Sequence, residues 1–340
     1  MARAAREAGV PGPRILRSFQ CPPLFRGVVL AHGPASTNVL GVDVGAVSVS
    51  AVEIGPGGEV LRTFYRLHQG DVEGALAALL AGTDLAALAA VTCTTSTPAL
   101  LQAAARYDNQ LCLITAAQRF HPRARSILVV GGERFGLVRF DEAGRYLSYR
   151  ANPLCAAGTG GFVDQQARRL NLAGAADLAE LALANREPLP RIASRCAVFA
   201  KTDLAHAQQE GYALEAICDG LCQGVAKNIA DTLFTGEAVV PPLLVAGGVA
   251  KNAAVMGHLR DLVGVETLVE RDLPMGAAGA ALKGLEALDR LGRRAAPLTA
   301  GELLRREVSA RSYDYAPLEL RLSAYPDFGS LDKSLFHGRV

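Results

Sequence analysis

Two cysteines in matched surroundings are the residues of this sequence best suited to chemistry. Cys155 stands in the glycine-rich stretch NPLCAAGTGG, and Cys196 stands in SRCAVFAKTD. Each precedes a segment with helical periodicity, at 161–171 and at 200–209. The positive end of a helix stabilises an anionic thiolate, and a thiolate can act as a metal ligand. A single cysteine in such a place would be interpreted as packing, whereas two predict a chemical role.

The remaining cysteines are interpreted as structural: Cys21, Cys93, Cys112, Cys218 and Cys222. Cys218 and Cys222 lie four residues apart in an expected helix at 212–235, which fits either a metal-binding pair or a buried stripe of small residues. We favour the stripe. Cys93 and Cys112 lie in apolar runs that are expected to be core strands. Because the seven cysteines form neither an even disulfide set nor a zinc CxxC pair, a reducing, cytoplasmic location is expected.

The composition indicates a folded chain without a membrane span or a nucleic-acid partner. Half of the 340 residues are hydrophobic, 20% are charged, and the net charge is +2. No apolar run reaches the roughly 18 residues of a membrane-spanning helix. A chain of this length usually divides into two domains. The first 37 residues lack helical periodicity and are expected to be a disordered leader.

The pattern after the leader predicts strands followed by helices. Three consecutive strands are expected in LGVDVG, SVSAVEI and EVLRTFYRLH. The sequence then predicts a helix in VEGALAALLAG, a strand in AAVTCTT, a helix at 98–107 and a strand at 111–115. Alternating strands and helices of this kind are typical of α/β layers.

A similar order then repeats. SILVV, FGLVRF and RYLSYRA predict three further strands joined by turns, and an internal duplication is the simplest interpretation. Helices are expected at 161–171, 174–184, 200–209 and 212–235. They are followed by the strand PLLVAGG, a helix from Lys251, an apolar run at 264–269, and a helix from Pro274.

Three glycine turns are candidates for phosphate binding. The first follows Asp43 and contains Gly45, and the equivalent turn of the repeat contains Gly131 and Gly132. Such turns can surround a phosphate with backbone N–H groups, and a carboxylate at the strand end can hold Mg2+ through water. A third turn at 247–252 could accept the base or ribose of a nucleotide. The alternative for each turn is an ordinary connection with glycine for tight packing.

In this order, the duplicated hairpins, GGVAKN and MGAAGAAL resemble the actin, Hsp70 and sugar-kinase ATPase superfamily. CAAGTGGF, the AVFA run after the second cysteine, and GGVAKN together resemble the BadF/BadG family, over roughly residues 38–290. That family comprises ATPase activators of 2-hydroxyacyl-CoA dehydratases and ATPase subunits of benzoyl-CoA reductases. The resemblance implies an actin-like (ribonuclease H-like) α/β fold whose duplicated domains enclose a nucleotide cleft.

The expected domain limits follow from the resemblance and the repeat. They are a leader at 1–37, a first lobe at 38–120, a second lobe at 121–292 with the cysteine segment and a returning C-terminal helix, and a tail or linker at 293–340.

The resemblance also implies cofactors and partners. Cys155 and Cys196 would be the metal ligands, and two subunits of a homodimer would share one 4Fe-4S cluster. ATP and Mg2+ would be bound with Asp43 and Glu133 in catalytic roles. The residues that would contact the nucleotide are Gly45, Ser48, Gly131, Gly132, Gly158, Gly160, Gly247, Gly248 and Asn252. The partners would be a CoA-ester dehydratase or reductase component and an electron donor such as ferredoxin or flavodoxin.

Two departures from the family pattern concern the phosphate turns. The first hairpin of the family typically reads GxDxGSTxxK, and here Ala46, Val47 and Ser50 replace its Ser, Thr and Lys. The second typically reads DIGGQDSK, and here it is VVGGERFG, with a valine for the first Asp, Glu133 for Gln and Arg134 for the second Asp. Lost charge-assisted contacts to phosphate would weaken binding or turnover.

Three functions therefore stand as hypotheses. The first is an ATP-dependent iron-sulfur ATPase that donates single electrons to a CoA-ester dehydratase or reductase. The second is a scaffold or assembly subunit that holds a cluster without hydrolysing ATP. The third, a small-molecule kinase, would have no use for the cysteine pair.

Overall fold

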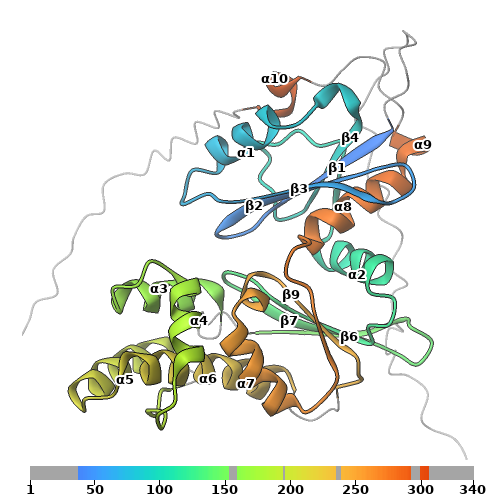
Figure 1. Ribbon diagram of the computed structural model, residues 1–340. Coiled ribbons are helices and arrows are strands. Elements are labelled where there is room, and N and C mark those ends of the chain that lie inside the picture. The colour runs from blue at the N-terminus through green and yellow to red at the C-terminus, as the bar shows by residue number, and fades with distance from the viewer. Residues whose placement is uncertain (1–36, 153–158, 194–195, 235–238, 292–298, 306–340) are drawn as a thin grey trace, which may run out of the picture. The chain divides into compact units, whose positions relative to one another are not determined.

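The computed structural model describes residues 37–152, 159–193, 196–234, 239–291 and 299–305 (Figure 1). The expected leader, Cys155, Gly158 and residues 306–340 lie outside the described residues. No helix in these ranges is both long and apolar enough to cross a membrane.

The first sheet has the strand order β3-β2-β1-β4-β5. β1 (Asn38–Val44), β2 (Ser48–Ile54) and β3 (Val60–Leu67) form the expected antiparallel hairpins. β4 (Leu88–Thr94) and β5 (Ala105–Tyr107) continue the sheet in parallel with β1. Because β1 and β4 are parallel neighbours, their carboxyl ends meet at one edge, where Asp43 lies.

Helices cover both faces of this sheet. α1 (Val72–Ala81) packs against β2 and β3, and its Leu76 and Leu79 share a core with Leu40 and Val42 of β1. The other face packs against α8 (Met275–Glu286), which comes from the far end of the chain, and α8 in turn packs against α2 (Asn109–Phe120) (Figure 1). A short 3-10 turn, η1 (Leu85–Ala87), precedes β4. The returning C-terminal helix expected from Pro274 therefore packs on the first sheet. This sheet and the helices that cover it are the first half of the fold, and the second sheet with its helices is the second half.

Two predicted elements of the first half are wrong. Residues 98–107, expected to be a helix, form a turn followed by β5, and residues 111–115, expected to be a strand, lie inside α2. The carboxylate of Asp108 accepts hydrogen bonds from the N–H groups of Gln110 and Leu111 and so caps α2. Cys112 is buried as expected, but on a helix. Capping and packing against α8 outweigh the strand preference of the run LCLIT.

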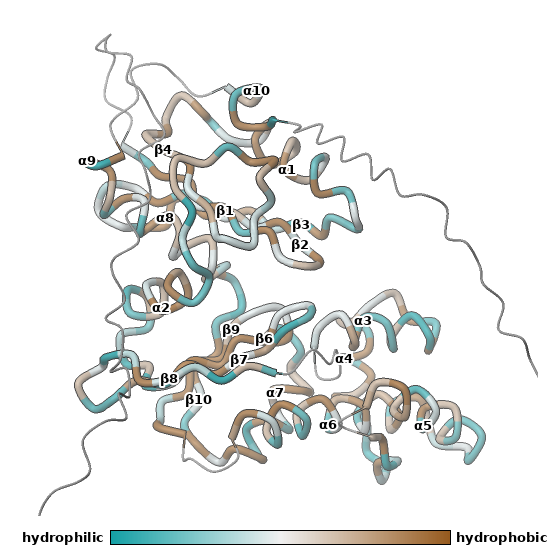
Figure 2. The backbone as a smooth tube through the Cα atoms, turned by 180° about the vertical axis from the view of Figure 1, so that it is seen from behind, coloured by the Kyte–Doolittle hydropathy of each residue, from teal (hydrophilic) through white to brown (hydrophobic). Residues whose placement is uncertain are grey.

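The second sheet repeats the arrangement, with the strand order β10-β9-β6-β7-β8. β6 (Ser126–Val130), β7 (Phe135–Phe140) and β8 (Tyr146–Ala151) are antiparallel, whereas β9 (Leu243–Ala246) and β10 (Thr267–Val269) run parallel to β6. Hydrophobic residues dominate β6 and β9 (Figure 2). An antiparallel trio extended by two parallel strands occurs in both halves, which confirms the predicted duplication.

The described residues of the second half contain five helices and a 3-10 turn: α3 (Gly160–Arg169), α4 (Ala175–Ala184), α5 (Ala197–Gln209), α6 (Leu214–Leu233), η2 (Gly248–Lys251) and α7 (Ala253–Val263). They share one core with β6, β7 and β9, in which α6 is the most extensively buried helix. α9 (Leu288–Leu291) follows α8.

Residues 299–305 belong to the stretch expected to be a tail or linker. They contain α10 (Ala300–Leu303), and the buried side chain of Leu303 joins the core of the first sheet. An antiparallel bridge pairs Leu304 with Leu101. The domain limits themselves stay a prediction.

Candidate functional site

The first glycine turn joins β1 to β2 and places Asp43 at its base. The N–H of Gly45 donates to the carbonyl of Ser48 at 2.9 Å, which closes the turn. Asp43 is half-buried one residue before the end of β1. Its Oδ1 accepts hydrogen bonds from the hydroxyls of Thr94 at 2.6 Å and Ser96 at 3.0 Å.

These hydroxyls belong to a polar segment that begins at the last residue of β4 and that sequence reasoning missed. Thr97 also belongs to it, because its Oγ1 accepts from the N–H of Val44 at 3.2 Å. Asn109, the first residue of α2, donates from Nδ2 to Ser96 Oγ at 2.9 Å and accepts from Ser96 N at 3.2 Å. The sequence does show four consecutive hydroxyl residues, 94–97, at the end of an expected strand, but only the structure shows that this strand pairs with β1.

The start of α8 lies on the other side of Asp43. A Cβ atom at Gly276 would lie only 2.8 Å from Asp43 Oδ2, so any side chain there would displace the carboxylate. The N-terminal end of a helix carries a partial positive charge that favours an anion. Asp43 is therefore held between hydroxyl donors and a helix start.

The second glycine turn joins β6 to β7 and uses its backbone. The N–H of Gly131 donates to the carbonyl of Arg134 at 2.8 Å, as Gly45 does in the first half. The carbonyls of Gly131 and Gly132 accept from the N–H groups of Gly160 and Gly161 at 2.9 and 2.8 Å, so this turn holds the start of α3. Glu133, at the tip of the same turn, is exposed to solvent.

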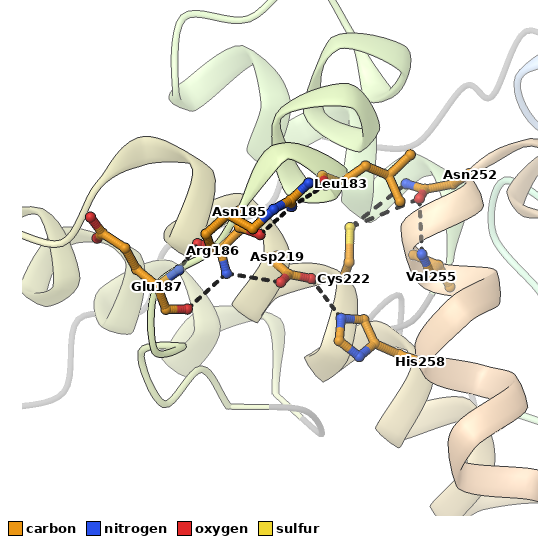
Figure 3. A network of polar contacts seen from close by, with 9 residues as sticks. All are labelled: Leu183, Asn185, Arg186, Glu187, Asp219, Cys222, Asn252, Val255 and His258. Atoms are coloured by element: carbon orange, nitrogen blue, oxygen red, sulfur yellow. Dashed lines mark hydrogen bonds and ion pairs between the residues drawn. The ribbon is translucent and has the colours of Figure 1, made fainter.

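The third turn follows β9. Gly247 has a φ of +95°, and a Cβ there would lie 2.4 Å from the carbonyl oxygen of Val130, so the position requires glycine. Gly248, by contrast, has open space around it. Asn252 is buried, caps α7 by accepting from the N–H of Val255 at 3.0 Å, and contacts the sulfur of Cys222 (Figure 3).

Close approaches bring several of the predicted residues together. A Cβ on Gly132 would lie 2.8 Å from Cγ2 of Val47, so the first and second glycine turns are adjacent. Gly160 lies beside Gly131 and close to Val249, the residue after Gly248. Lys251 contacts the ring of Tyr65 on β3, with Nζ 4.8 Å from the ring centroid, a contact that sequence reasoning did not anticipate.

Cys196 lies at the start of α5, where the sequence placed it. It is the residue immediately before Ala197, is partly exposed, and its side chain makes no capping hydrogen bond to the helix. Val198 and Phe199, in the first turn of the helix, are 68% and 65% exposed. The second predicted ligand, Cys155, and the nucleotide residue Gly158 lie outside the described residues.

The other described cysteines are buried. Cys218 and Cys222 lie in the core on α6, as predicted. Burial raises the pKa of Cys218 to about 11 and that of Cys222 to about 12. Burial likewise raises the pKa of Cys93, and that of Cys112 to about 12. These thiols stay protonated near neutral pH and are poor metal ligands.

A metal ion at the described residues would need additional ligands, such as water, a nucleotide or further thiolates. The part of the chain that the structure describes contains no group of three or more His, Cys, Asp or Glu side chains that could surround an ion. Asp43 could hold Mg2+ through water together with a nucleotide, because within the described ranges its hydrogen bonds engage only Oδ1. Cys196 could hold iron only together with further thiolates.

Comparison with known proteins gives a consistent result. The sequence profile described as "BadF/BadG/BcrA/BcrD ATPase family" matches residues 40–284. The 2-hydroxyisocaproyl-CoA dehydratase activator of Clostridioides difficile is 31% identical over 163 residues, which cover 47% of this chain and 60% of the relative. A benzoyl-CoA reductase subunit from Thauera aromatica is 30% identical over 183 residues, covering 51% and 64%. The alignments thus span less than two thirds of these relatives.

The fold is shared with a solved structure. The activator of the 2-hydroxyisocaproyl-CoA dehydratase from Clostridium difficile with bound ADPNP superimposes with a TM-score of 0.68 at 23% identity, covering 75% of this chain and 96% of that one. With the two matching sheets, this likeness confirms the predicted duplicated, actin-like α/β fold.

Proposed function

The chain belongs to the BadF/BadG/BcrA/BcrD ATPase family, and we propose that it is an iron-sulfur ATPase that donates single electrons to a CoA-ester dehydratase or reductase component. ATP would be hydrolysed between the two halves, and a 4Fe-4S cluster would be shared by two copies of the chain. A ferredoxin or flavodoxin would supply the electrons.

The observation that carries the nucleotide half is the adjacency of the two glycine turns, with Val47 against Gly132. Backbone N–H groups of such turns suit phosphate oxygens. Asp43 would hold Mg2+ through water, and Glu133 would position the attacking water. The other residues proposed to contact the nucleotide are Gly45, Ser48, Gly131, Gly158, Gly160, Gly247, Gly248 and Asn252. Of these, Asn252 would act through the turn that it stabilises, since its side chain already caps α7.

The cluster half depends on Cys155 and Cys196. A 4Fe-4S cluster needs four thiolates, so two copies related by a two-fold axis would complete the set. When bound, the cluster would accept and release one electron at a time. The start of α5 favours negative charge at Cys196. The exposed side chains of Val198 and Phe199 support a second copy as the neighbour of this helix.

The proposed partners follow from relatives named as a dehydratase activator and as part of benzoyl-CoA reductase. Because the alignments span only part of those proteins, the partner class is itself part of the proposal.

A second candidate is a cluster-holding scaffold that does not hydrolyse ATP. One observation favours it: the methyl groups of Val47 face Gly132 at the point where the two turns meet. An apolar side chain there donates no hydrogen bond to phosphate. Arg134, where the family motif typically has an aspartate, is exposed at the second turn.

Anaerobic purification tests the proposal. We expect a brown protein with about four irons and four sulfides per dimer, a dimeric mass, and ATP hydrolysis that requires Mg2+. Cys196→Ser should remove the iron and loosen the dimer, whereas Cys218→Ala, a buried control, should do neither. Iron without hydrolysis would favour the scaffold. A colourless dimer from the wild type would contradict both candidates.

A further inference from the structure

We infer that Thr94 and Ser96 are positioning residues for Asp43: their hydroxyls fix one carboxylate oxygen and leave the other for the water shell of nucleotide-bound Mg2+. The inference rests on the proposed function, because it assigns a role toward the Mg2+ of that site. Neither residue belongs to the glycine motifs on which the resemblance is based.

The direction of the hydrogen bonds is settled by the chemistry of the groups. An ionised carboxylate can only accept, so Thr94 and Ser96 both donate to Oδ1. Asn109 donates from Nδ2 to Ser96 Oγ and therefore leaves the Ser96 proton for Asp43. The result is a directed chain from the start of α2 to the carboxylate.

Burial makes the first of these bonds rigid. Thr94 is fully buried, and its Oγ1 also lies 3.2 Å from that of Thr97, whose own hydroxyl is tied to the backbone of β1. The torsion that rotates a carboxylate about its last carbon-carbon bond is soft and has no sharp minima. Two donors on one oxygen therefore decide how the group is oriented.

The second oxygen of the carboxylate takes no part in these two hydrogen bonds. Among the described residues the hydrogen bonds to this carboxylate end on Oδ1, and Oδ2 lies beside Gly276 at the start of α8. Because Gly276 has no side chain, α8 packs beside this oxygen without displacing it, and the Asp43 side chain stays half-buried. The carboxylate thus has one structural and one functional oxygen.

The composition of the first turn explains why this support comes from β4. Ala46 and Val47 offer no hydroxyl or charge, and Ser50 donates weakly to the carbonyl of Asp43 at 3.4 Å rather than to its carboxylate. The polar groups that orient Asp43 therefore come from a neighbouring strand.

The test compares nucleotide affinity with and without Mg2+. The ratio of ATP dissociation constants measured in EDTA and in Mg2+ reports the contribution of the metal and needs no turnover. We expect Thr94→Val combined with Ser96→Ala to reduce this ratio by at least about tenfold. The affinity in EDTA should stay unchanged. Thr94→Ser alone, which keeps the hydroxyl, should leave the ratio at its wild-type value.

A matched control lies two residues earlier on the same strand. Thr92 is equally buried, and its hydroxyl donates to the carbonyl of Ala280 on α8 at 2.8 Å. Thr92→Val removes a buried hydrogen bond of β4 without touching Asp43, so it should preserve the ratio. If the double variant fails to fold, Ser96→Ala alone, at an exposed position, should still lower the ratio.

The outcomes separate this inference from the proposed function. A wild-type chain that binds no ATP in either buffer would overturn the proposed function and the inference with it. A wild type whose affinity rises with Mg2+, with the same rise in the double variant, would overturn the inference alone. An equal loss in Thr92→Val would also overturn it, because the effect would then be structural.

Discussion

The two halves of the fold share a backbone turn but differ in what the turn presents. In both, a glycine N–H closes the turn onto a carbonyl three residues later, at 2.9 Å for Gly45 and 2.8 Å for Gly131. Two residues before the glycine, the first half has Asp43 and the second half has Val129. The carboxylate of Asp43 is held by hydroxyl donors, and Val129 packs against the core.

In the second half the contacts of the glycine turn are made by its backbone and not by a charged side chain. The carbonyls of its turn accept from the first N–H groups of α3, and the carbonyl of Val130 lies against Gly247. The duplication therefore preserved hydrogen bonding of the main chain while side chains diverged. The turn of the first half presents the carboxylate of Asp43, whereas the turn of the second half is defined by close contacts of its backbone.

The largest effect is expected at the carboxylate. Asp43→Asn keeps the size of the side chain but removes its charge, so Mg2+-dependent ATP hydrolysis should fall on the order of a thousandfold. Steady-state phosphate release measures it. The matched change at the same register of the second half, Val129→Asn, should cost less than about tenfold. Similar losses of hydrolysis in both variants would show that the two glycine turns do not differ in their contribution to catalysis.

A smaller effect, on stability, should come from the backbone of the second half. Gly247→Ala forces a left-handed φ on a residue with a side chain and places its Cβ against Val130, so the free energy of unfolding should fall by roughly 1–3 kcal/mol. Urea unfolding checks it. Gly248→Ala is the control, because a Cβ there meets nothing within 4 Å and φ is not positive. Equal stability of the two variants would show that the left-handed φ of Gly247 and its close approach to Val130 do not stabilise the second half.

Much of this arrangement could be predicted from sequence because it is local. Alternating apolar residues and glycine punctuation identify both hairpin trios, and Cys196 does precede a helix. The placement of Asp43 at the end of a strand follows from the same pattern. Local signals suffice where a strand, a turn and the next strand are consecutive.

The rest depended on contacts between distant segments. The stretch from Leu111 to Thr115 is rich in residues that favour strands, yet the cap from Asp108 and packing on α8 make it helical. The hydroxyls of Thr94 and Ser96 reach Asp43 only because β4 pairs with β1, which lies about fifty residues earlier in the chain. Periodicity does not encode strand order, so it could not bring these groups together.

The smallest expected effect concerns a carboxylate of the second half that is used for structure. Glu270, just after β10, accepts from the N–H groups of Asp272 and Leu273 with Oε1 and from His121 with Oε2. Both of its oxygens are thus occupied, unlike those of Asp43. Burial raises the pKa of Glu270, but these hydrogen bonds outweigh it, so the pKa lies below its ordinary value of 4.5.

A lowered pKa in the folded state fixes the sign of the pH dependence. The unfolded chain binds the proton more readily, so the stability from Glu270 is present above its ordinary, unfolded pKa and is lost as the pH falls through the folded pKa. Glu270→Gln should therefore lower the urea midpoint near neutral pH, and its difference from the wild type should shrink below about pH 4. Glu266→Gln is the control, because Glu266 pairs with Arg123 at an exposed site where ion pairs contribute little. A difference in urea midpoint that stays constant down to low pH would show that the charge of Glu270 does not stabilise this half. Glu270 and Asp43 would then differ only in where they lie in the fold.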